Sequence, residues 1–263
     1  MAGFDAMVYD QIRKLKNETD FIIVSALTAA EMLPWPSPHR QDTWRALIDA
    51  GADVVHGHHA HAPQGWEAYR GGLIFYGLGN FCVDPSKWAW HPNGSWSLSP
   101  EISLSDGPLA MNPVTTVVED HGQVMTVRAS NKDESESHRE YLDECNRPLA
   151  DRVILEGLWQ EAAMQMYDAY YADWLGFDLP FTKLLYRSLR KNLGTIKQQT
   201  LKKTRSDMRE SRLQFGHPLR YYLFTCESHN DAISTALGVL SGEVAGLRTD
   251  VTSAMLEKHF INT

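Results

Sequence analysis

The sequence predicts an α/β fold, a partial sandwich with a mixed sheet, followed by an all-helical C-terminal region. Two observations carry this prediction. Short β-branched runs alternate with helix-periodic segments over about the first 130 residues, which is the pattern of a βαβ unit. From residue 148 onward, apolar residues recur at helical spacing. With 263 residues, the chain is long enough to bury a hydrophobic core.

The first four expected elements form one βαβ unit preceded by a helix. In chain order they are a helix at 4–17, a strand at 20–25, a helix at 39–50 and a strand at 52–57. The strand at 20–25 is rich in β-branched residues, and we expect it to be buried. In the second helix we expect Trp44, Leu47 and Ile48 to point inward, with Gly51 as the glycine that follows a helix. So short a crossover predicts parallel strands and a right-handed connection.

The remaining expected elements are strands and then helices. The strands are expected at 66–70, 73–77, 114–119 and 123–128, the last two as an antiparallel hairpin. Segment 131–147 is polar and is expected to be a linker, with the start of a new unit as the alternative. Candidate helices follow at 148–175, 180–212, 228–242 and 248–260. The predicted organisation is therefore an α/β domain over 1–130, the linker, and a helical domain over 148–263.

The charge distribution limits the partners of the chain. The formal net charge is −8, which argues against specific nucleic-acid binding. Residues 183–220 nevertheless hold 11 basic and 2 acidic residues. This basic segment is either the solvated face of helices or a surface for a partner protein or an anionic polymer.

The cysteines and the hydropathy pattern indicate neither a disulfide framework nor a membrane span. Cys82, Cys145 and Cys226 are odd in number and form no C-x-x-C pair; we expect Cys82 and Cys226 to be ordinary core thiols. No apolar run approaches the roughly 18 residues of a transmembrane helix, and we expect no signal peptide in the N-terminal residues. The sequence therefore leaves the compartment unknown.

Three tryptophans, Trp88, Trp90 and Trp96, gather in the Pro-, Gly- and Ser-rich segment 85–96. Flat apolar rings favour sugars and polymers as ligands. Packing against a sheet edge is the competing explanation, and we favour it.

The strongest chemical signal is the run 56-HGHHAH-61, which emerges from the strand at 52–57. Histidine is the commonest metal ligand near neutral pH, because a neutral imidazole binds without first losing a proton. On extended backbone, alternate residues point to the same side. We therefore expect His59 and His61 to face one metal ion together. The run follows the carboxyl end of a parallel strand, where open α/β sheets place their ligands.

A resemblance to a known family rests on one stretch, 48-IDAGADVVHGHHAHAPQGWEAYRGGLIFYGLGNFCVD-84. This stretch is similar to the C-terminal signature of the CapA-type capsule-synthesis family, the poly-γ-glutamate biosynthesis proteins with a metallophosphoesterase-like fold. Members carry AGADVV-G-x-H-P-H-x-x-Q, followed by LI-Y-S-L-G-N-F. Here Ala60 replaces the proline and Gly77 the serine. The resemblance implies that residues 1–130 are the C-terminal portion of such an α/β domain.

By this resemblance, His59 and His61 take two metal-ligand positions and Asn80 takes the asparagine of the G-N-F turn. The implied cofactor is a divalent cation, Mn, Zn or Mg. Glu31 and Asn80 are the candidate catalytic residues: Glu31 would polarise a metal-bound water, and Asn80 would orient the loop. His58 stands at a position that varies in the family. Family members usually act at the membrane or outside the cell.

Two departures from the family pattern leave the implied metal site incomplete. The family segment S-x-H-W-G-x-E reads 25-SALTAAE-31 here, so Leu27 stands at a ligand histidine position. The family's Gly-Asp and Asn-Asn-His motifs are expected upstream of residue 1. Two imidazoles are fewer than the three protein ligands of a typical catalytic zinc site. Metal binding by this chain alone is therefore expected to be weak or absent.

The resemblance implies a role in making, transferring or trimming an anionic exopolymer, with metal-dependent hydrolase or transferase ancestry. The alternative is a non-catalytic relative that binds a polymer or a partner protein, which Leu27 favours. A third hypothesis, an amidohydrolase that uses the H-x-H motif, requires a TIM barrel. The helical C-terminal region supplies no strands for one.

Overall fold

The computed structural model describes residues 2–84, 91–104, 109–122, 124–175 and 222–259. They fall into two compact units, the first comprising Met1–Ala162 with Ala245–Ile261 and the second Ala163–Val244. An α/β part is followed by a helical region, so the predicted fold class is confirmed.

A four-stranded sheet of order β1-β2-β4-β3 forms the centre of the first unit. Its strands are β1 (Ile23–Ala26), β2 (Val54–Gly57), β3 (Trp66–Tyr69) and β4 (Gly72–Phe75). Strands β1 and β4 both run parallel to β2, whereas β3 is antiparallel to β4. The sheet is therefore mixed, and its four strands lie where the sequence predicts them, within a few residues.

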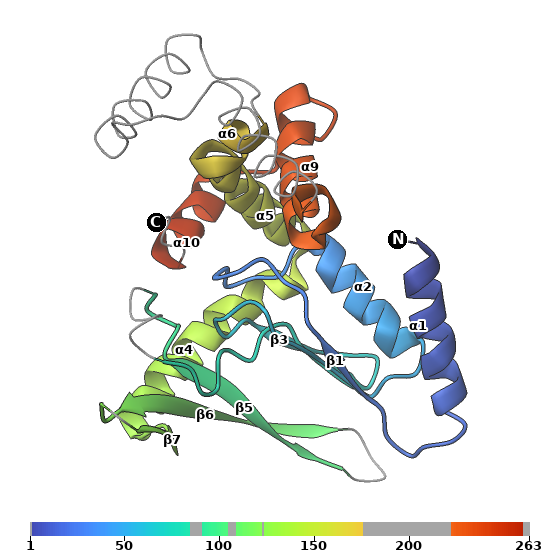
Figure 1. Ribbon diagram of the computed structural model, residues 1–263, viewed down its shortest axis with the longest axis vertical. Helices are drawn as coiled ribbons and strands as arrows, with labels where there is room; N and C mark the ends of the chain where they lie inside the picture. Colours follow the sequence, from blue (N-terminus) through green and yellow to red (C-terminus); the bar gives the residue numbers. More distant parts are fainter. Residues whose placement is uncertain (1, 85–90, 105–108, 123, 176–221, 260–263) are drawn as a thin grey trace, which may run out of the picture. The chain divides into compact units, whose positions relative to one another are not determined.

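Helix α2 (Pro38–Asp49) connects β1 to β2 and packs on β2 and β4 (Figure 1). The Ser37 hydroxyl caps its first turn by accepting a hydrogen bond from the Arg40 N–H. Trp44, Leu47 and Ile48 are buried, as predicted. Helix α1 (Ala2–Leu15) precedes β1 and confirms the predicted N-terminal helix.

Strand β1 contradicts the expectation of a buried strand. It lies at the edge of the sheet, and Ile23 is 57% exposed. A β-branched run predicts that a strand forms, but the strand is buried only when other strands lie on both sides of it. Among the described strands, only β2 pairs with β1.

A second, antiparallel sheet of order β5-β6-β7 follows. It consists of β5 (Trp96–Ser103), β6 (Ala110–Asp120) and β7 (Met125–Ala129), so the predicted hairpin is confirmed. The sequence did not predict β5, because prolines are unfavourable in strands, and Pro100 and Pro113 face each other across β5 and β6. Trp96 opens β5, is buried and stacks on the His138 ring; Trp88 and Trp90 lie outside the described residues.

The expectation of a linker over 131–147 is wrong, because most of this segment is helix α4 (Lys132–Asn146). The Asn131 and Glu134 side chains cap the first turn reciprocally. The helix lies between the two sheets and contacts β3 and β6 (Figure 1). Only three of its residues are buried, namely Tyr141, Leu142 and Cys145. So narrow an apolar stripe explains why the hydrophobic pattern did not predict a helix.

The later helices of the structure overlap the helices that the sequence predicts at 148–175, 228–242 and 248–260. They are η1 (Arg147–Ala150), α5 (Arg152–Met166), the π-helical η2 (Tyr167–Tyr171), α6 (Ala172–Leu175), α9 (Glu227–Ser241) and α10 (Asp250–His259). The expected helix at 180–212 and the basic segment 183–220 lie outside the described residues. Within the described residues, no helix has the length and apolarity to cross a membrane. Cys82 is exposed and Cys226 half-buried, so the expectation of two core thiols is wrong.

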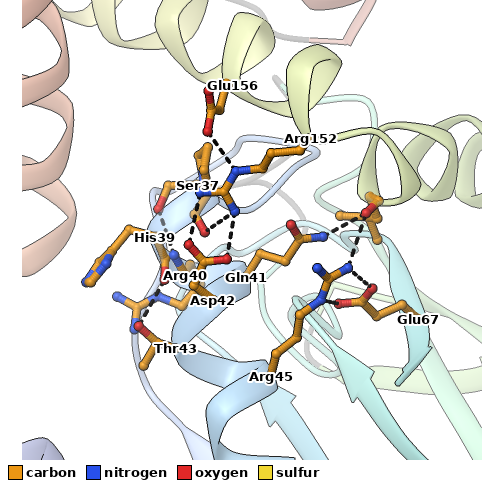
Figure 2. Close-up of polar contacts among 12 residues, drawn as sticks. Ser37, His39, Arg40, Gln41, Asp42, Thr43, Arg45, Glu67, Arg152 and Glu156 are labelled. Carbon is orange, nitrogen blue, oxygen red and sulfur yellow. Dashed lines mark hydrogen bonds and ion pairs between the residues drawn. The ribbon is translucent and has the colours of Figure 1, made fainter. Parts of the chain in front are cut away.

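A polar cluster holds α2 against β3 and the start of α5 (Figure 2). Arg45 donates two hydrogen bonds to the Glu67 carboxylate, from Nε at 3.0 Å and from Nη2 at 2.6 Å. Arg152 binds both oxygens of Asp42, at 2.7 and 2.9 Å, and reaches Glu156 through Nε. Such two-pronged pairs fix orientation as well as distance. The cluster therefore sets how α2 lies over the sheet.

Gly57, the last residue of β2, provides a test of this packing. A Cβ added there would overlap the Trp44 ring and the Tyr76 carbonyl. We expect Gly57→Ala to lower the free energy of unfolding by about 1–3 kcal/mol or more, as overpacking does. Urea denaturation measures the change. Gly246→Ala is the control, because nothing lies within 4 Å of its added Cβ; equal losses in both variants would contradict the packing described.

Candidate functional site

The histidine run begins in β2 and continues past its end. Strand β2 stops at Gly57, and His59 and His61 both adopt the left-handed conformation with φ of 57°. The expectation of extended backbone is therefore wrong, and simple alternation does not apply. The turn nevertheless brings the His59 and His61 rings together, with centroids 6.0 Å apart and planes tilted by 45°.

His56 and His58 form a separate pair, with ring centroids 4.8 Å apart in an edge-to-face arrangement. His58 Nε2 lies 2.9 Å from the Ser25 hydroxyl of β1. Burial, aided by the neighbouring His58, lowers the pKa of His56. His56 is therefore neutral at pH 7 and adds no positive charge to the site.

The side chain of Asn80 fixes the protonation of His61. Asn80 Nδ2 donates to two carbonyl oxygens, those of His61 and Gly94, at 2.9 and 3.1 Å. This sets the orientation of the amide, so the atom 2.8 Å from His61 Nδ1 is Oδ1, which can only accept. His61 Nδ1 must carry the proton. In the neutral ring, the lone pair is then on Nε2, the form in which a histidine binds metal with its other nitrogen hydrogen-bonded.

Strand β5 holds the turn that carries Asn80. Gly79 pairs with Ser97 across a β-bridge, and the Ser97 hydroxyl accepts a hydrogen bond from the Phe81 N–H at 2.6 Å. Gly79 has φ of 86°, which glycine adopts without steric cost. The site thus depends on a strand that the sequence did not predict.

Glu31 and His59 face each other at longer range. Glu31 Oε1 lies 3.9 Å from His59 Nδ1, which is ion-pair range but beyond a hydrogen bond. His59 Nδ1 is buried and has no hydrogen-bond partner among the described residues. Leu27, which the family resemblance predicts to stand at a ligand histidine position, is 74% exposed. The structure therefore brings Glu31 near the pair, whereas Leu27 contributes no ligand atom.

Backbone strain is concentrated in the segments around the site. The described residues include five non-glycine residues with positive φ. Four of them, Met32, His59, His61 and Phe81, lie in these segments. Each such residue costs about 1–3 kcal/mol and is typically found where function requires it. The Met32 N–H donates to the Ala60 carbonyl at 2.7 Å and ties the segment of Glu31 to the histidine turn.

Two residues near the site were not singled out from the sequence. Gln64 is buried and donates to the Leu33 carbonyl at 2.8 Å, while its N–H reaches the Gly77 carbonyl. It is the glutamine of the H-x-x-Q pattern, so the signal was present. His91 has no partner at diagnostic spacing in the sequence, which predicts a surface or loop residue. That prediction is wrong, because His91 is buried, and burial lowers its pKa.

The site brings together two imidazole rings and one nearby carboxylate, that of Glu31. No group of three or more His, Cys, Asp or Glu residues is arranged to hold a metal ion in the part of the chain that the structure describes. The site offers two neighbouring imidazole rings. The proton of His61 is fixed, and His59 Nδ1 is buried without a hydrogen-bond partner among the described residues.

The segment that contains these residues is similar to a known protein family. Residues 3–85 match the model of the family described as bacterial capsule synthesis protein PGA_cap. This segment is of the CapA type. It contains β1 to β4, the histidine run and Asn80.

Relatives of the CapA-type segment come from several bacteria. The capsule biosynthesis protein CapA of Bacillus anthracis is 41% identical over 69 residues, which are 26% of this chain and 17% of the relative. The PGA biosynthesis protein CapA of Bacillus subtilis is 38% identical over 73 residues, 28% of this chain and 19% of the relative. A probable polyglutamine synthesis accessory protein of Mycobacterium tuberculosis is 55% identical over 38 residues, 14% of this chain and 10% of the relative. The matched part thus spans less than a fifth of each relative.

The protonation assigned to His61 is testable without a metal. Long-range ¹H–¹⁵N NMR distinguishes the two neutral tautomers, and we expect His61 to carry its proton on Nδ1. Asn80→Ala removes the acceptor, so the Nε2–H form should gain population. His39 serves as the internal control and should not change. Observation of Nε2–H in the unaltered chain would contradict the assignment.

Proposed function

We propose that this chain takes part in the biosynthesis of a capsule or another anionic exopolymer such as poly-γ-glutamate, and that His59 and His61 supply two ligands of a divalent cation. The family match supports the first part. The observation that carries the second is the His61 ring, whose Nδ1 is held by Asn80 so that Nε2 is the metal-binding atom.

The geometry of the pair is compatible with one shared cation. With a metal–nitrogen distance of about 2.0–2.1 Å, two imidazoles on one ion have ring centroids about 5–6.4 Å apart, and the observed separation is 6.0 Å. Within the described part of the chain, the buried Nδ1 of His59 has no hydrogen-bond partner. This supports the same assignment, because a buried polar atom without a partner is costly. Two imidazoles alone do not complete a centre, so further ligands have to come from groups outside the described set.

When bound in a complete centre, a divalent cation lowers the pKa of a coordinated water and polarises a phosphoryl or carbonyl oxygen. That chemistry suits a hydrolase or transferase. Within this chain, Asn80 would orient His61, and Glu31 would lie beside His59 as the nearby carboxylate. Manganese, zinc and magnesium are the candidate ions, with zinc favoured by imidazole ligands and magnesium by oxygen ligands.

A manganese titration followed by NMR line broadening tests the cation site. We expect broadening centred on His59 and His61, and an affinity about 10–100-fold or more lower in His59→Ala, since loss of an outer-shell partner alone costs that much. His121→Ala, which alters an exposed histidine between β6 and β7, is the matched control. Broadening centred elsewhere, or equal in the two variants, would contradict the proposal.

A second candidate function is a non-catalytic relative that binds an anionic polymer or a partner protein. The specific observation in its favour is the exposed, apolar Leu27 at a position where a ligand is expected. In this case the histidine turn would have only a structural role and would not bind a cation. The basic segment 183–220 remains a predicted surface for such a partner.

Restoring the missing imidazole distinguishes the two functions. Leu27 is largely exposed, so Leu27→His should leave the free energy of unfolding nearly unchanged. If His59 and His61 hold a cation, a third ligand should tighten zinc binding by about tenfold or more, equivalent to about 1.4 kcal/mol. Isothermal titration calorimetry measures this affinity, and Leu104→His, at another exposed leucine, is the control. No gain over the control would favour the non-catalytic function.

A further inference from the structure

A pocket of about 430 Å³ opens at the surface of the first unit, beside the end of α4. Its lining residues come from α4, η1, α5 and α10, and all of them belong to that unit. The volume lies within the range of about 300–1,000 Å³ that is usual for small-molecule sites. None of the lining residues belongs to the histidine turn or to the segments of Glu31 and Asn80. The pocket is therefore separate from the candidate cation site.

One wall of the pocket is aliphatic. It is formed by the side chains of Pro148, Ile154, Val251, Ala254 and Met255. The last three lie three or four residues apart on α10, which places them on one face of the helix. Among the described residues that line the pocket there is no phenylalanine, tyrosine or tryptophan. An alkyl chain suits this wall better than an aromatic ring, because the wall offers no ring to stack on and Met255 adapts to irregular shapes.

The charged side chains of the pocket leave an excess of positive charge. Two cations, Arg147 and Lys258, and one carboxylate, Glu144, line it. Both oxygens of Glu144 are occupied, since Lys258 Nζ lies 2.6 and 2.7 Å from them and His259 Nε2 donates to Oε2 at 2.7 Å. Hydrogen bonds from Lys258 lower the pKa of the Glu144 carboxyl, and burial lowers the pKa of His259. At pH 7 the carboxylate therefore balances one cation, and the histidine adds no charge.

Arg147 is the cation that this network does not neutralise. It follows α4 directly and is exposed. Among the described residues, its side chain takes part in no ion pair. A guanidinium group binds a carboxylate through two parallel hydrogen bonds. A ligand that combines an alkyl chain with a carboxylate would therefore find both an aliphatic wall and a cation in this pocket.

We propose that this pocket binds a fatty acid, with its alkyl chain on the aliphatic wall and its carboxylate on Arg147. Attraction to an anionic membrane surface takes clusters of about 4–8 basic residues. The pocket has one cation in excess, which favours a free amphiphile over a bilayer. The inference goes beyond the proposed function and does not depend on it, because the two sites share no residue.

A titration of the full chain with sodium decanoate, followed by NMR of the methyl groups, tests the inference. Decanoate is kept below the concentration at which it forms micelles, at pH 7, where its carboxyl group is ionised. We expect saturable shifts at the methyl groups of Ile154, Val251 and Met255. Val153 is 60% exposed and does not line the pocket, so it is the internal reference. Decanol, the neutral analogue, should bind about threefold or more weakly, because it cannot form the ion pair.

Two variants with matched controls test the wall and the cation separately. Val251→Asp places a charge on the aliphatic wall and should weaken decanoate binding by about tenfold or more. Its control is Val153→Asp, since the two valines are 62% and 60% exposed. Arg147→Gln should weaken decanoate binding by about threefold or more and leave decanol binding unchanged. Its control is Arg139→Gln, which alters an exposed arginine of α4 that does not line this pocket.

Three results would overturn the inference. The methyl groups of the wall could remain unshifted, decanol could bind as tightly as decanoate, or shifts could appear only with decanoate micelles or phosphatidylglycerol vesicles, which would identify a lipid surface as the occupant. The outcome is separable from that of the proposed function. His59→Ala, which removes a proposed cation ligand, should leave decanoate binding unchanged, and a loss of binding in that variant would count against a separate pocket.

Discussion

The contact between Trp44 and the backbone of Gly57 is the constraint on which the CapA-type segment depends. Trp44 is buried, stacks on Tyr76 at 5.3 Å, and lies where any side chain at residue 57 would be. This contact holds α2 against the middle of the sheet at the point where β2 ends. Strand β2 ends at Gly57, and His59 and His61 lie in the left-handed turn that follows.

The turn is held by contacts that are distant in sequence. The Asn80 side chain forms hydrogen bonds with the carbonyl and the ring of His61. The Ser97 hydroxyl of β5 accepts a hydrogen bond from the backbone of the turn that carries Asn80. The Gln64 side chain donates a hydrogen bond to the Leu33 carbonyl. Left-handed backbone at His59 and His61 persists because these contacts together outweigh its cost. The protonation and the position of His61 are therefore set by contacts within the protein itself.

The sequence by itself determined the local elements and the identity of the key side chains. Periodicity predicted α2 with Trp44 and Ile48 inward, the parallel β1–β2 pair and the strands β3 and β4, because these patterns depend on each element burying one face. The ordered motif around His59, His61 and Asn80 indicated the family. Only the tertiary structure decided that β1 is the edge strand of the described sheet, that segment 132–146 is a helix, and that β5 supports the site. It also decided the left-handed turn and the proton on His61. Each of these features depends on contacts with residues far away in the sequence. A hydrophobic pattern indicates which residues form a helix or a strand, but not which other elements pack beside it.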